Sequence, residues 1–162
     1  MSEIIKLWSD GWLGGCRNNQ CANNNIGAYA YHLEYWVDGK LIHEKSCSEG
    51  ERNTTNNIQE IKGCLFGLKA IKDKTIKVEV YLDSSYVLLG ITQWINGWIA
   101  KGWVNSKKEP VKNKELWIAL DNEKSKFRNI EFIKVKGHAN DEGNILVDSL
   151  LNKCMDEMIK ED

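Results

Sequence analysis

Four acidic side chains occupy positions where expected strands end or helices begin: Asp10, Glu60, Asp83 and Asp148. Two of them follow strand-like segments, residues 4–9 and 76–82, and the other two fall in the first turns of helical patterns. If the first and fourth strands are parallel neighbours, their carboxyl ends lie together, where such sheets hold their sites. The spacing therefore allows one shared acidic pocket.

Four carboxylates in one pocket repel one another unless a cation compensates their charge. Oxygen ligands without a nearby thiolate or paired histidine suit Mg²⁺ or Mn²⁺. Two such ions about 4 Å apart can activate a water and stabilise the departing oxygen of a phosphodiester. The alternative is that each acid is a turn residue or a helix cap. With 23 acidic residues, some fall at element ends by chance, and the sequence does not fix the strand order.

The elements that must position these acids follow from hydrophobic periodicity. The pattern predicts three strands, a helix, a strand, two helices, a strand and a helix. Strands are expected at residues 4–9, 28–36, 40–46, 76–82 and 130–135, and helices at 56–73, 84–98, 113–126 and from about 144 onward. This order predicts an α/β fold, a mixed five-stranded sheet flanked by helices, in one domain spanning residues 1–162.

Local signals sharpen three boundaries in this pattern. Asn56, followed three residues later by Gln59, is expected to cap the first helix as a capping box. Asp38 and Gly39 predict a two-residue hairpin turn. Residues 11–27, rich in Gly and Asn, are expected to form a long loop between the first two strands.

Composition excludes several classes of protein. The chain has 162 residues, 42% of them hydrophobic and 28% charged, and a net charge of -1, which is typical of an ordinary globular protein. No apolar run approaches a membrane span, and the N-terminus lacks a signal peptide, so we expect a cytoplasmic, monomeric protein without membrane contact. The odd number of cysteines, five, favours free thiols. A zinc site at Cys16 and Cys21 lacks histidines at ligand spacing.

Several motifs together resemble type 1 ribonuclease H in its bacterial form with a basic protrusion. Residues 8–11 (Trp-Ser-Asp-Gly), 53–60 and 80–84 are similar to the segments that carry that family's acids. Residues 90–95 and 110–113 resemble its protrusion, and residues 135–139 followed by Asn144 and Asp148 complete the set. The resemblance spans nearly the whole chain in the family's order, and it implies the ribonuclease H-like fold.

This resemblance implies an endonuclease that hydrolyses the RNA strand of RNA–DNA hybrids with two Mg²⁺ ions, for which Mn²⁺ can substitute, leaving 5′-phosphate and 3′-hydroxyl ends. Asp10, Glu60, Asp83 and Asp148 would bind the metal ions, and His138 would assist proton transfer or product release. Nucleic-acid contacts are expected from further residues of the helix start, the protrusion and the last helix: Thr55, Asn56, Asn57, Gln59, Trp94, Lys107, Lys108, Lys112 and Asn144.

The chain also departs from the family's pattern. Trp12 stands where the family usually has a small residue, and Ser85 stands where a Gln is common. Because the protrusion carries fewer charges than a strongly basic one, we expect weaker substrate binding. Three alternatives remain: a module that holds hybrids without cutting, a transposase or junction-resolvase core, and a domain of a reverse transcriptase. The four acids disfavour the first, the chain's short length the second, and its Met start and acidic end the third.

Overall fold

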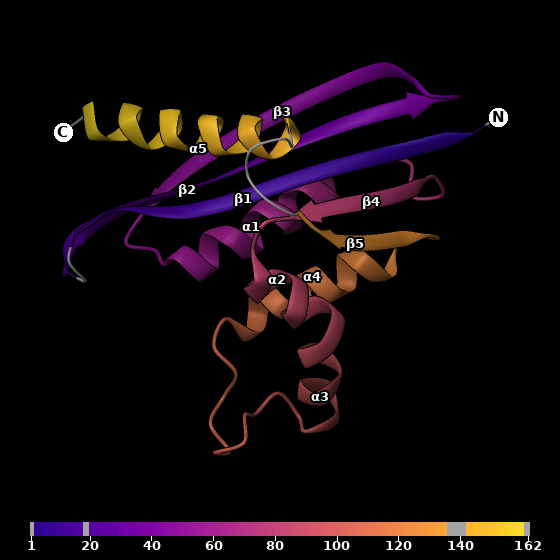
Figure 1. The fold of residues 1–162 in the computed structure, drawn as a ribbon. Helices are drawn as coiled ribbons and strands as arrows, with labels where there is room; N and C mark the ends of the chain where they lie inside the picture. The colour runs from indigo at the N-terminus through magenta and orange to yellow at the C-terminus, as the bar shows by residue number, and fades with distance from the viewer. Residues whose placement is uncertain (1, 18–19, 136–141, 161–162) are drawn as a thin grey trace.

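A mixed five-stranded sheet lies at the centre of the computed structural model, which describes residues 2–17, 20–135 and 142–160 (Figure 1). The strand order is β3-β2-β1-β4-β5. The strands are β1 (Glu3–Arg17), β2 (Gln20–Val37), β3 (Lys40–Arg52), β4 (Lys77–Leu82) and β5 (Ile130–Lys134). The first three form an antiparallel meander, and β1, β4 and β5 run parallel. The expected α/β fold with a mixed five-stranded sheet is confirmed.

The register between β1 and β4 places two of the acids side by side. Ser9 in β1 pairs with Leu82 in β4. Since the two strands are parallel, the next residue in each chain segment, Asp10 and Asp83, emerges at the same edge of the sheet. The parallel pairing that the sequence could not establish is therefore what brings these carboxylates together.

Helices cover both faces of the sheet (Figure 1). On one face lie α1 (Asn56–Ala70) and α4 (Lys114–Ser125), and on the other lies α5 (Glu142–Lys160). The segments α2 (Ser85–Leu89), the π-helical turn η1 (Gly90–Trp94) and α3 (Ile95–Ala100) follow one another without a break and project below the sheet. Within the described residues, no helix has the length and apolar character needed to cross a membrane.

Alternation along β1 and β2 divides the core into two layers. Leu7 and Tyr31 pack in the larger cluster with Ile61 of α1. The neighbouring positions point the other way, and Trp8 packs with Val147 of α5 in the second cluster. The period of two in a strand explains this division, because successive side chains lie on opposite faces.

The start of α1 differs from the prediction. Thr55, not Asn56, is the N-cap, and its Oγ1 accepts a 3.1 Å hydrogen bond from the backbone N–H of Ile58. The expected capping box was wrong because Gln59 is fully buried and donates to side chains beneath the helix instead. The helix also ends at Ala70, short of the expected residues 72–73.

The expected loop at residues 11–27 was also wrong. There β1 and β2 continue as a long antiparallel ladder, in which Gly11 pairs with Tyr29, Leu13 with Gly27 and Cys16 with Cys21. Glycine and asparagine are poor strand formers by intrinsic preference, but cross-strand pairing overrides that preference. The strand β3 likewise extends to Arg52, beyond the expected end at residue 46.

Candidate active site

A pocket of about 330 Å³ is lined by all four of the predicted acids. Asp10 comes from β1, Glu60 from α1, Asp83 from the end of β4 and Asp148 from α5. Residues from these same segments complete the lining: Trp12, Ser84, Asn144 and Ile145. Four acidic side chains that are far apart in the sequence thus line one pocket.

A close approach of α1 to β1 sets the position of Glu60 beside Asp10. A Cβ atom on Gly11 would lie 2.3 Å from the carbonyl carbon of Gln59 and 2.3 Å from the backbone nitrogen of Glu60. One on Gly63 would lie 2.9 Å from the backbone oxygen of Asp10. Only glycine leaves room for backbones this close. These two glycines therefore let the helix carry Glu60 to the strand end.

Burial and neighbouring acids raise the pKa of Asp10. Its pKa rises from 3.8 to about 7, first because burial penalises the charged form and then because Asp83, Asp148 and Glu60 repel it. The backbone N–H of Gly11, which donates a 2.9 Å hydrogen bond to Oδ1, acts in the opposite direction. The carboxylate of Asp10 is thus costly to ionise until positive charge arrives.

Glu60 is held more favourably in its ionised form. Burial raises its pKa and Asp83 adds to the rise, but hydrogen bonds from Ser84 and Asn56 and the charge of Lys134 lower it. Ser84 donates from Oγ to Glu60 Oε2 at 2.8 Å. The Nζ of Lys134 donates to the backbone oxygen of Asp83. Glu60 therefore has side-chain donors and a nearby positive charge, whereas Asp10 accepts from a backbone N–H, that of Gly11.

The donor set of this pocket fits hard divalent cations. Its described lining holds four carboxylates, the hydroxyl of Ser84 and the amide of Asn144, with neither thiol nor imidazole among them. Oxygen ligands of this kind are those that Mg²⁺ and Mn²⁺ prefer. The raised pKa of Asp10 fits the same reading, because a bound cation would relieve the repulsion that causes part of it.

The residues expected to contact nucleic acid differ in their exposure to solvent. Thr55 and Asn57 are exposed at the start of α1, and Trp94 is 39% exposed in η1. The expected lysines are exposed between α3 and α4: Lys107, Lys108 and Lys112. Asn144 is buried and lines the pocket, whereas His138 lies outside the described residues.

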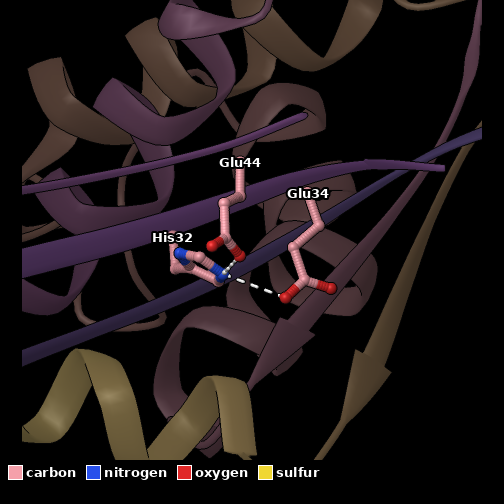
Figure 2. A group of neighbouring side chains, drawn as sticks. All are labelled: His32, Glu34 and Glu44. Atoms are coloured by element: carbon pink, nitrogen blue, oxygen red, sulfur yellow. Dashed lines mark hydrogen bonds and ion pairs between the residues drawn. The ribbon is translucent and has the colours of Figure 1, made fainter. Parts of the chain in front are cut away.

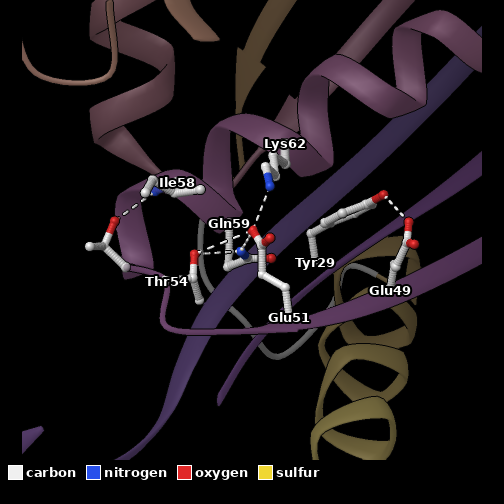
Figure 3. Close-up of polar contacts among 8 residues, drawn as sticks. Tyr29, Glu49, Glu51, Thr54, Ile58, Gln59 and Lys62 are labelled. Atoms are coloured by element: carbon white, nitrogen blue, oxygen red, sulfur yellow. Dashed lines mark hydrogen bonds and ion pairs between the residues drawn. The ribbon is translucent and has the colours of Figure 1, made fainter. Parts of the chain in front are cut away.

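Gln59 does not reach the surface, so its expected contact with nucleic acid was wrong. Its Nε2 donates to Glu51 Oε1 at 2.6 Å and to Thr54 Oγ1 at 2.7 Å (Figure 3). Lys62 also pairs with Glu51. This network joins the first turns of α1 to the end of β3, and the residue after Gln59 is Glu60. Gln59 therefore supports the position of the acid instead of meeting a substrate.

Sequence reasoning missed the roles of Trp12 and Ser84 in this pocket. Trp12 was noted only as a departure from the family's pattern, but its side chain is 56% exposed and lines the pocket with the acids. Ser84 was expected only at the start of the helix at 84–98, yet it caps that helix and also holds Glu60. The signal available in the sequence was proximity, since Trp12 lies two residues from Asp10 and Ser84 directly follows Asp83.

Comparison with known proteins shows the family of this chain. The RNase H family model matches residues 4–155. The chain is 43% identical over 158 residues to a ribonuclease H of Clostridium botulinum, covering 97% of this chain and 98% of that protein. It is 46% identical over 156 residues to a ribonuclease H of Chromobacterium violaceum, covering 96% and 97%.

Solved structures agree in fold. LC9-RNase H1, described as a type 1 RNase H with the type 2 active-site motif, superposes with a TM-score of 0.81 at 22% identity, covering 97% of this chain and 74% of that one. The RNase H domain of PFV superposes with a TM-score of 0.72 at 22% identity, covering 97% of each chain. With the family match over nearly its whole length, the chain belongs to the ribonuclease H family, the hydrolases that cleave RNA in RNA–DNA hybrids as endonucleases.

Proposed function

We propose that this protein hydrolyses the RNA strand of RNA–DNA hybrids in the pocket of Asp10, Glu60, Asp83 and Asp148, with Mg²⁺ as cofactor and Mn²⁺ as a substitute. The observation that carries the proposal is the convergence of these four carboxylates, from four elements, on one pocket. Two divalent ions held by such carboxylates would activate a water and stabilise the departing oxygen, leaving 5′-phosphate and 3′-hydroxyl ends.

The chain's own residues position this chemistry. The Asp10 carboxylate is turned toward the pocket with one oxygen bound to the N–H of Gly11, and Ser84 orients the carboxylate of Glu60. Lys134 adds fixed positive charge near Glu60 and Asp83. Because each group is held by a backbone or side-chain hydrogen bond, little reorganisation is required when substrate arrives.

Recognition of the hybrid is assigned to residues around the pocket. Thr55 and Asn57 lie at the N-terminus of α1, whose free amides favour a phosphate. Amide side chains such as Asn56 and Asn144 can donate to and accept from a ribose 2′-hydroxyl, the group that distinguishes RNA from DNA. Trp94 and the exposed lysines 107, 108 and 112 would contact the backbone farther away.

The test is cleavage of labelled RNA–DNA, RNA–RNA and DNA–DNA duplexes of one sequence, each with Mg²⁺ and with EDTA. We expect cutting only in the RNA strand of the hybrid and only with the metal. Asp148→Asn should abolish or strongly reduce cleavage while hybrid binding persists, and Asp83→Asn should do the same. Asp156→Asn, an exposed acid on the same helix as Asp148, is the matched control. Full activity in Asp83→Asn would remove the metal-site assignment.

His138 is proposed to assist proton transfer or product release. His138→Ala should therefore lower the turnover rate without preventing cleavage. A variant that is folded but wholly inactive would assign His138 an indispensable role and contradict this proposal.

A further inference from the structure

A second group of metal-ligating side chains lies outside the acidic pocket. His32 and Glu34 on β2 and Glu44 on β3 bring one ligand atom each to within 4.8 Å of one another (Figure 2). The Nε2 of His32 is 3.0 Å from Glu34 Oε2 and 3.7 Å from Glu44 Oε2. None of the three lines the pocket of the four acids. This cluster therefore needs an explanation of its own.

Strand pairing forces two like charges together in this cluster. Glu34 and Glu44 are direct partners in the antiparallel ladder of β2 and β3. Like charges directly opposite one another destabilise a sheet. On the other side of β2, Lys6 of β1 pairs with Glu34, and its Nζ lies 5.2 Å from the ring centroid of Trp36. A positive charge between the two carboxylates would remove the repulsion.

The ligand atoms are oriented by their neighbours. The Nδ1 of His32 lies 2.6 Å from Ser46 Oγ, on the residue that pairs with it across the ladder. The Nε1 of Trp36 donates to Glu34 Oε1 at 2.9 Å, which leaves Oε2 facing the imidazole. Fixing one ring nitrogen of a histidine and one oxygen of a carboxylate is how proteins orient ligands toward a metal ion.

The chemistry between the three groups requires either a proton or a cation. Carboxylate oxygens only accept hydrogen bonds. An unprotonated Nε2 of His32 would therefore be repelled by the carboxylates of Glu34 and Glu44 unless a cation lies between the three groups. If Nδ1–H donates a hydrogen bond to Ser46 Oγ, the Nε2 lone pair is free for a metal ion. Ligand atoms of a tetrahedral zinc ion lie about 3.3 Å apart, and the two distances in this cluster bracket that value.

We propose that His32, Glu34 and Glu44 form a site for one divalent transition-metal ion of the Zn²⁺ type. Imidazole favours such ions over Mg²⁺, which separates this site from the acidic pocket. His32 is 3% exposed, while the Glu44 side chain is 58% exposed and lines an open pocket of about 580 Å³, so an ion has a path to the histidine. The ion would cross-link the edge strand β3 to β2 and leave one coordination position for water.

The experiment measures Zn²⁺ binding to the full chain carrying Asp10→Asn and Asp83→Asn, with excess Mg²⁺ present, so that uptake by the acidic pocket is suppressed. Isothermal titration calorimetry should show one Zn²⁺ per chain at this cluster, and Zn²⁺ should raise the thermal unfolding midpoint by roughly 5 °C. Adding His32→Gln or Glu44→Gln should weaken this binding by at least about tenfold and remove most of the rise.

One of these variants and a control variant keep the result decisive. Glu44→Gln alters an exposed side chain, so it tests the site even if the buried His32→Gln variant does not fold. His43→Gln, on β3 like Glu44 but outside the cluster, is the matched control and should bind like its parent. The proposal fails if the parent takes up no Zn²⁺, or if Glu44→Gln binds it as tightly as the parent does. Because neither readout depends on cleavage, its failure is distinguishable from failure of the proposed nuclease activity.

Discussion

Ser84 Oγ donates a 2.8 Å hydrogen bond to Glu60 Oε2 and itself accepts a 3.2 Å hydrogen bond from the backbone N–H of Val87. One hydroxyl therefore caps α2 and orients a carboxylate of α1. The two helices meet at the edge of the sheet where Asp83 follows β4, so the arrangement couples local helix formation to the geometry of the acidic pocket.

Replacing Ser84 should disturb both roles. Ser84→Ala removes a hydrogen bond that lowers the pKa of Glu60, so that pKa should rise and the acidic limb of the kcat profile should move to higher pH. Loss of the cap should also cost about 1 kcal/mol of stability. Ser84→Thr keeps the hydroxyl and is the control. Superimposable pH profiles for Ser84→Ala and the parent would refute the coupling.

Asp10 should make the metal-free protein less stable as the pH rises. Its pKa is 3.8 in the unfolded reference and about 7 in the fold, so between these values the folded state holds a proton that the unfolded state has released. The free energy of unfolding therefore falls through this window. Asp10→Asn has no carboxyl to titrate at this position, so its free energy of unfolding should depend less on pH. At about pH 8 the free energy of unfolding of Asp10→Asn should exceed that of the parent by about 1–3 kcal/mol.

Urea unfolding in EDTA across this pH window measures the difference. The control is Asp156→Asn, which changes an exposed acid on α5 and should keep the slope of the parent. Parallel curves for Asp10→Asn and the parent would show that the Asp10 carboxyl does not titrate abnormally.

Trp12 should contribute to substrate binding more than to folding. Its side chain is 56% exposed at the acidic pocket, so Trp12→Ala should leave stability nearly unchanged and raise KM for the hybrid. An aromatic side chain stacked on a base is worth about 1–3 kcal/mol, or about fivefold to 150-fold in KM. Trp12→Phe should recover most of the loss. Steady-state kinetics that give equal KM values for Trp12→Ala and the parent would exclude this contact.

The exposed lysines between α3 and α4 should set the salt dependence of binding. Lys107→Ala with Lys108→Ala should raise KM and reduce the slope of log affinity against log salt by about 1–2 units. The double variant Lys40→Ala with Lys72→Ala removes the same charge elsewhere on the surface and is the control. Salt titrations in which both double variants keep the slope of the parent would exclude substrate contact at these two lysines.

Much of the fold could be read from periodicity because each helix or strand buries one face. Ile76 to Leu82 alternates as a half-buried strand does, and β4 lies at residues 77–82. A helix was expected from residue 84, and the Ser84 hydroxyl caps α2 by accepting from the backbone N–H of Val87. The positions of the acids at element ends were visible for the same reason. The spacing of residues along the chain is enough to predict a helix, strand or cap when residues close in sequence decide it.

Other features depended on partners distant in sequence. Gln59 looked like a capping residue, but packing of α1 over Glu51 and Thr54 buried it. Residues 11–17 looked like a loop, but pairing with β2 made them a strand. Composition and motif spacing alone determined the fold class, the family resemblance and the four candidate acids. Only the tertiary structure decided that those acids share a pocket with Trp12 and that Glu34 faces Glu44 across a ladder, because strand register and helix packing are long-range contacts that no local pattern encodes.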